Sequence, residues 1–115
     1  MAAVVEDPPD LATMRATARR LLAGDAKPIG GNELEALRLA LRGHLQLLIP
    51  EVEKLACGLP KGDIPAACAM AGVREAETRL RLGTGENSPV RMSVAMRLAR
   101  SVNALCDHYT ALSKS

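Results

Sequence analysis

The longest apolar pattern in this 115-residue chain has the spacing of an α-helix. Its members recur every three or four residues, at Leu34, Leu37, Leu41, Leu45, Leu48, Val52 and Leu55. A second, smaller row of apolar residues runs beside it, at Ala36, Ala40, Gly43 and Leu47. Residues at this spacing share one side of a helix, and a helix that is apolar over so wide an arc belongs at the centre of a fold. The pattern therefore predicts a long central helix.

Pro50 falls inside this pattern without changing its phase. A proline within a helix lacks the N–H donor and crowds the carbonyl of the residue four positions earlier, here Gln46. The helix must therefore either bend at Pro50 or end there and restart. Glu51 would suit the first turn of a new helix, but Ile49 would be a poor cap for it. We predict a continuous helix with a kink.

Three further segments carry helical apolar spacing, and each predicted helix has a start signal. The signals are side chains whose oxygen can accept a hydrogen bond from the first turn: Asp10, Asn32, Asp63 and Ser88. The first helix should end near Ala23, where Gly24 can supply a left-handed cap. The apolar rows of the third and fourth helices are Ala66, Ala69, Val73, Ala76 and Leu80, and Val90, Val94, Leu98, Val102, Leu105, Tyr109 and Leu112.

These four helices predict an all-α fold, a compact four-helix bundle with a proline-kinked second helix, because no segment alternates as a strand does. Residues 1–9 are expected to form a flexible N-terminal arm, and residues 10–115 a single helical domain. The core must be aliphatic, since the chain has no Phe or Trp and one Tyr, although 48% of its residues are hydrophobic.

The remaining composition excludes several function classes. A net charge of +2 is too small to indicate a nucleic-acid binder, and no apolar run is long enough for a membrane span. Cys57, Cys68 and Cys106 form no C-x-x-C pair, which favours reduced thiols and a cytoplasmic protein. Neither His-Glu-x-x-His nor Glu-x-x-His occurs, so we expect no metal and no cofactor.

Four polar residues beside the apolar rows form the predicted ligand-binding site. His44 and Glu51 lie seven residues apart and share one face of the second helix. Arg97 and His108 lie on one stripe of the fourth helix. If these two helices are neighbours, the four side chains could meet in a polar pocket near the Pro50 kink. No catalytic residue is assigned.

Two alternative functions stay open. Residues 63–82 resemble a helix-turn-helix, with a turn at residues 71–73, which would make the protein a DNA-binding transcriptional regulator. The apolar row passes through Gly72 in one phase, however, so we favour a single helix and do not expect nucleic acid as a partner. The other alternative is a small enzyme in which His44 and His108 form an acid–base pair.

Three blocks of the sequence resemble a known family. They span residues 41–53 (LRGHLQLLIPEVE), 59–65 (LPKGDIP) and 103–109 (NALCDHY). The chain is similar over about residues 10–112 to a family of small uncharacterised actinomycete proteins labelled natural-product biosynthesis proteins. The resemblance implies a setting among antibiotic biosynthetic genes and no particular reaction.

Together these observations predict an accessory or regulatory binding protein of natural-product biosynthesis. It would be non-catalytic and would dock a partner protein or a small apolar ligand, with the polar site orienting that ligand. Met14, Met70, Met92 and Met96 would add adaptable contact surface if exposed. The wide apolar arcs of the second and fourth helices also predict a homodimer.

Overall fold

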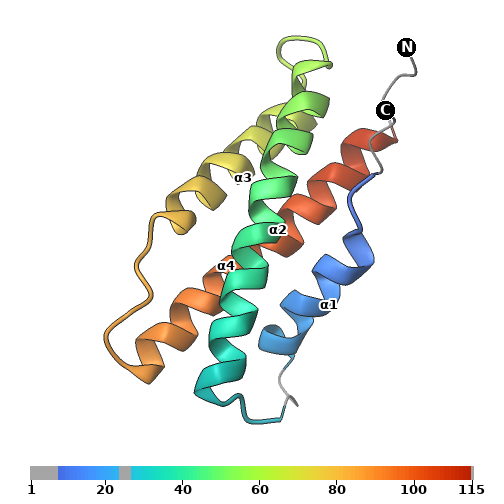
Figure 1. Ribbon diagram of the computed structural model, residues 1–115. Coiled ribbons are helices and arrows are strands. Elements are labelled where there is room, and N and C mark those ends of the chain that lie inside the picture. The colour runs from blue at the N-terminus through green and yellow to red at the C-terminus, as the bar shows by residue number, and fades with distance from the viewer. Residues whose placement is uncertain (1–7, 24–26, 115) are drawn as a thin grey trace, which may run out of the picture.

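A computed structural model describes residues 8–23 and 27–114 (Figure 1). The described residues form four helices and no strand, which confirms the predicted all-α four-helix bundle. The helices are α1 (Leu11–Leu22), α2 (Gly31–Cys57), α3 (Ile64–Leu80) and α4 (Ser88–Ser113).

Successive helices run in opposite directions, so the two long ones, α2 and α4, run the same way (Figure 1). α2 and α4 pack against each other, and each of them also contacts both α1 and α3. Within the described residues α1 and α3 do not touch, because they lie on opposite sides of the central pair. α1 has 12 residues and α2 has 27, or roughly 18 Å against 40 Å. The shorter α1 therefore leaves part of α2 uncovered.

The core is one cluster of aliphatic side chains from all four helices. Its largest fully buried members lie on α2 and α4, where they include Leu41, Leu45, Leu48, Leu98 and Leu105. The predicted central position of the second helix is confirmed, since α2 contacts each of the other helices.

Two of the predicted apolar rows are less buried than their spacing suggested. Ala36 and Leu47, in the second row of α2, are exposed, because this side of α2 has little cover from α1. Val90 is 44% exposed, because it lies in the first turn of α4 at the tip of the bundle. Helical spacing identifies a face, but the length of the neighbouring helix decides how far that face is covered.

The helix caps agree with the predictions at two of four positions. The side chains of Asp10 and Asp63 accept hydrogen bonds from the backbone N–H groups of Thr13 and Ala66. The prediction of Asn32 is wrong, because α2 already begins at Gly31 and Gly30 precedes it without a side-chain cap.

The cap of α4 is one residue earlier than predicted. Asn87 has extended backbone angles, and its side chain accepts from the N–H of Val90. Ser88 is therefore the first helical residue rather than the cap, and Pro89 lies in the first turn, where the missing N–H matters little. The predicted cap at Gly24 lies outside the described residues.

Both helices with a disruptive residue are continuous. α2 runs through Pro50, which confirms that the helix does not end and restart there, while the size of the bend stays a prediction. α3 runs through Gly72 as a single helix, so the turn that a helix-turn-helix needs at residues 71–73 is absent. The preference for one helix is confirmed.

Candidate functional site

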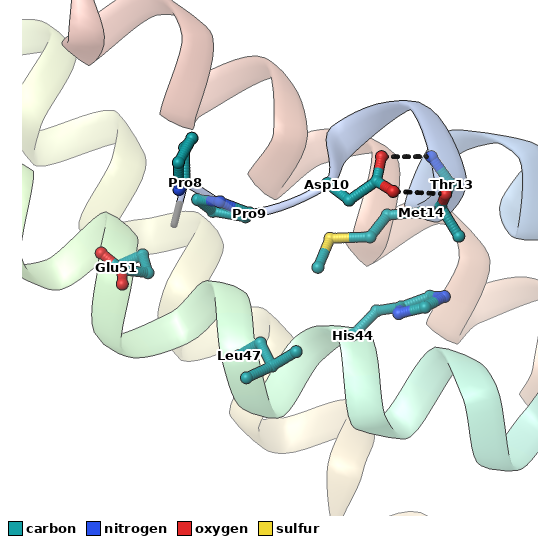
Figure 2. Close-up of a pocket in the computed structure, with 8 residues that line it drawn as sticks. All are labelled: Pro8, Pro9, Asp10, Thr13, Met14, His44, Leu47 and Glu51. Atoms are coloured by element: carbon teal, nitrogen blue, oxygen red, sulfur yellow. Dashed lines mark hydrogen bonds between the residues drawn. The ribbon is translucent and has the colours of Figure 1, made fainter. Parts of the chain in front are cut away.

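A groove lies where the start of α1 faces the middle of α2, and it encloses about 330 Å³. We call it the α1–α2 groove (Figure 2). Eight residues line it: Pro8, Pro9, Asp10, Thr13, Met14, His44, Leu47 and Glu51. The first five come from the start of α1 and the residues before it, and the last three come from α2.

The α1 side of the groove is held by the cap of that helix. The Asp10 carboxylate accepts from the Thr13 backbone N–H at 3.1 Å and from the Thr13 hydroxyl at 2.7 Å. These two hydrogen bonds lower the pKa of Asp10, so the carboxylate is ionised at neutral pH. Pro8 and Pro9 continue the wall beyond Asp10, and the fixed φ of proline restricts their path.

His44 stands at the other end of the groove, on α2, and contacts α1 through Thr17. The Thr17 hydroxyl lies 3.1 Å from His44 Nε2 and 3.1 Å from the Thr13 carbonyl oxygen. A hydroxyl has one hydrogen to donate, so both contacts are satisfied together when Thr17 donates to the carbonyl and Nε2–H donates to Thr17. This arrangement assigns the hydrogen to Nε2 and leaves Nδ1 as an acceptor.

Burial keeps the His44 imidazole neutral. Loss of hydration lowers the pKa of His44 from its ordinary value of 6.5, and the nearby Asp10 carboxylate opposes part of that shift. At neutral pH the groove therefore contains a neutral imidazole at one end, together with the carboxyl groups of Asp10 and Glu51.

Apolar side chains form the middle of the groove. Leu47 is 62% exposed on α2, and Met14 opposes it from α1 while remaining 3% exposed (Figure 2). Glu51 lies beneath Pro8 at the end away from His44, and it is half-buried. Among the described residues Glu51 has neither an ion pair nor a side-chain hydrogen bond.

The structure brings two of the four predicted site residues together. His44 and Glu51 both line the α1–α2 groove. Arg97 lines a different hollow, beside the loop between α3 and α4, and its carbonyl accepts from Arg79 at 3.0 Å. His108 lies against α3, because a Cβ built on Gly72 would stand 3.0 Å from its ring.

The expectation that all four residues meet near Pro50 is therefore wrong. Arg79 of α3 also donates to the Ser101 hydroxyl at 3.0 Å, so the stripe of α4 that carries Arg97 and His108 faces α3. The side of α2 that carries His44 faces α1 instead. The same geometry removes the basis for a His44/His108 acid–base pair, because the two rings belong to different helix interfaces.

The sequence interpretation missed most of the α1 side of the groove. Pro8 and Pro9 were assigned to a flexible arm, and Asp10 was recognised only as a cap. One signal was available, because Pro9 and Met14 occupy the positions before the cap and in the second turn that form a hydrophobic staple. The other three methionines of the predicted contact surface, Met70, Met92 and Met96, are half-buried.

The described residues contain neither a metal-binding cluster nor a helix suited to crossing a membrane. No group of three His, Cys, Asp or Glu side chains in residues 8–23 and 27–114 is arranged to hold a metal ion. In the same part of the chain, no helix combines the length and the apolar character that a membrane crossing requires.

The fold and the groove define a small all-α protein with a mainly apolar cleft beside a short first helix. The chain belongs to DUF6415, a family of unknown function, whose pattern it matches over residues 12–114. No curated protein and no solved structure matches the chain.

Proposed function

We propose that the protein is a non-catalytic binding protein that holds a small, largely apolar molecule in the α1–α2 groove. The observation that carries the proposal is the groove itself, with an apolar middle and a polar group at each end. Small-molecule sites commonly have this composition, in which apolar surface supplies affinity and a few polar groups set orientation. A volume of about 330 Å³ suits a small molecule.

The setting that we propose is natural-product biosynthesis, with an accessory or regulatory role. The support comes from the resemblance of residues 41–53, 59–65 and 103–109 to actinomycete proteins with that label. The first of these blocks contains all three α2 residues of the groove, His44, Leu47 and Glu51. A regulatory protein could report the level of a small metabolite by binding it there.

The DNA-binding alternative has less support. It depended on a turn within residues 63–82, and α3 is a single helix through that region. The alternative of a small enzyme built on His44 and His108 has no support, since the two side chains face different helices.

A neutral dye provides the first test. Nile red fluoresces strongly in apolar surroundings, so titration into the full-length protein should give saturable binding at one site. Leu47→Asp places a charge in the middle of the groove and should weaken the dye affinity about tenfold or more, because an unpaired charge is costly in apolar surroundings.

Leu39→Asp is the matched control. Leu39 is 55% exposed on the same helix and lies outside the groove, so this variant makes the same chemical change at a similar exposure. It should change the affinity less than about twofold. Equal effects of the two variants, or a dye signal that never saturates, would refute binding in the groove.

A further inference from the structure

We propose that the molecule bound in the α1–α2 groove carries a protonated amine on an apolar body. The inference rests on the proposed function and specifies its ligand by charge. The ammonium group would pair with Glu51, and the apolar body would lie along Leu47 and Met14 towards His44.

The charge around the groove has one sign. Asp10 and Glu51 supply two carboxylates, and no Arg or Lys lines the groove among the described residues. Arg15, the nearest arginine along α1, is paired with Asp107 of α4 at 2.8 Å. An anionic ligand would meet repulsion without a compensating cation, whereas a cation would find complementary charge.

The two carboxylates differ in what they still offer to a ligand. Asp10 already accepts two hydrogen bonds from Thr13, which hold it as the cap of α1. Glu51 has no such partner in the described part of the chain, although it is half-buried. Because Glu51 is unpaired in that part of the chain and lies beside an apolar wall, it is the group that would hold the ammonium.

The described residues place no cation at the opposite end of the groove either. His44 is neutral, and the tautomer set by Thr17 leaves its Nδ1 atom as an acceptor. His44 and Glu51 are seven residues apart on α2, which corresponds to roughly 10 Å along the helix. That separation fits an elongated body of about ring-plus-short-chain size, with Leu47 beneath its middle.

Three probes of nearly equal shape test the inference. Phenylbutylamine is a cation at neutral pH, phenylbutanol is neutral and 5-phenylpentanoate is an anion, while all three carry the same phenyl ring and four methylene groups. Isothermal titration with the full-length protein should give the order amine, alcohol, carboxylate. The amine should bind about tenfold more tightly than the alcohol, as expected for a charge-assisted hydrogen bond.

Glu51→Gln should reduce the preference for the amine over the alcohol to about twofold or less. Glu53→Gln is the matched control, because Glu53 is half-buried on the same helix and does not line the groove. It should leave the preference intact. The comparison among the three probes uses the unaltered protein, so it does not depend on the folding of any variant.

The outcomes separate the two proposals. If the alcohol or the carboxylate binds as tightly as the amine, or if Glu51→Gln keeps the preference, the amine inference is wrong although the groove still binds ligands. If none of the probes binds while Nile red binding remains sensitive to Leu47→Asp, the ligand class is wrong and the binding function stands. If Nile red binding is also insensitive to Leu47→Asp, both proposals fail.

Discussion

At the scale of the residue, Gly72 explains where His108 lies. Gly72 is inside α3, where a glycine weakens a helix by about 1 kcal/mol relative to alanine. A Cβ at this position would stand 3.0 Å from Cδ2 and 3.1 Å from Nε2 of His108. The glycine therefore lets the imidazole approach the α3 backbone, and His108 acts in packing between α3 and α4 rather than in the groove.

The contact can be measured with a double-mutant cycle. In a His108→Ala background, Gly72→Ala should stabilise the protein by about 1 kcal/mol in urea unfolding, because helix propensity then acts alone. With His108 present, the gain should fall by about 0.5 kcal/mol or more. Gly43→Ala is the control, since no other part of the described chain, apart from the neighbouring turns of α2 itself, lies within 4 Å of its added Cβ. The same gain from Gly72→Ala in both backgrounds would show that the contact has no energetic effect.

At the scale of the element, α2 keeps its helical path although Pro50 removes one hydrogen bond. The buried side chains on either side of it, Ile49 and Val52 among them, belong to the core cluster that all four helices share. Tertiary packing thus compensates for a residue that disfavours the helix locally. The proline is exposed, so its ring adds little to the core.

Replacing this proline should therefore stabilise the protein. Pro50→Ala restores an N–H that can donate to the Gln46 carbonyl, and we expect the free energy of unfolding to rise by about 1–3 kcal/mol. Pro65→Ala, in the first turn of α3, should change it by less than about 0.5 kcal/mol, because no helical acceptor awaits that N–H. A loss of stability in Pro50→Ala would show instead that the bend at Pro50 improves packing. Chemical denaturation monitored by circular dichroism gives both values.

At the scale of the whole molecule, the stability should depend on pH through His44. Its pKa is lowered from 6.5 in the folded protein, so the unfolded chain binds more protons than the folded one below about pH 6.5. The stability should therefore decrease as the pH falls from 6.5 towards the lower pKa of His44 in the folded state. Below that pKa, His44 causes no further loss of stability. The Asp10 cap is lost separately, at a pH below 3.8.

Unfolding measurements across that pH range test the assignment to His44. His44→Gln should flatten the decrease that begins near pH 6.5, while His108→Gln, which leaves His44 in place, should retain it. An unchanged pH profile in His44→Gln would assign the decrease to another group.

The homodimer predicted from the sequence stays a prediction, and analytical ultracentrifugation under the same conditions would measure the oligomeric state.

Much of the fold follows from local rules that a sequence contains. The helices were predicted from the apolar spacing of residues 34–55 and from the caps at Asp10 and Asp63. Both effects act within one or two turns of the chain. The continuous third helix was predicted in the same way, from the unchanged phase of its apolar row through Gly72. The caps predicted at Asn32 and Ser88 were misplaced by two residues and by one residue, because Gly30 and Asn87 precede these helices instead.

The candidate site also has a part that local rules predict and a part that they do not. The sequence alone determined that His44 and Glu51 share a face, since seven residues are about two helical turns. Which helix that face meets depends on how the four helices pack. α1 is too short to cover α2, and the start of α1 meets the His44–Glu51 side, whereas Arg97 and His108 face α3. The order of residues along a helix is a local property, but the partner of each face is set by the lengths and packing of all four helices together.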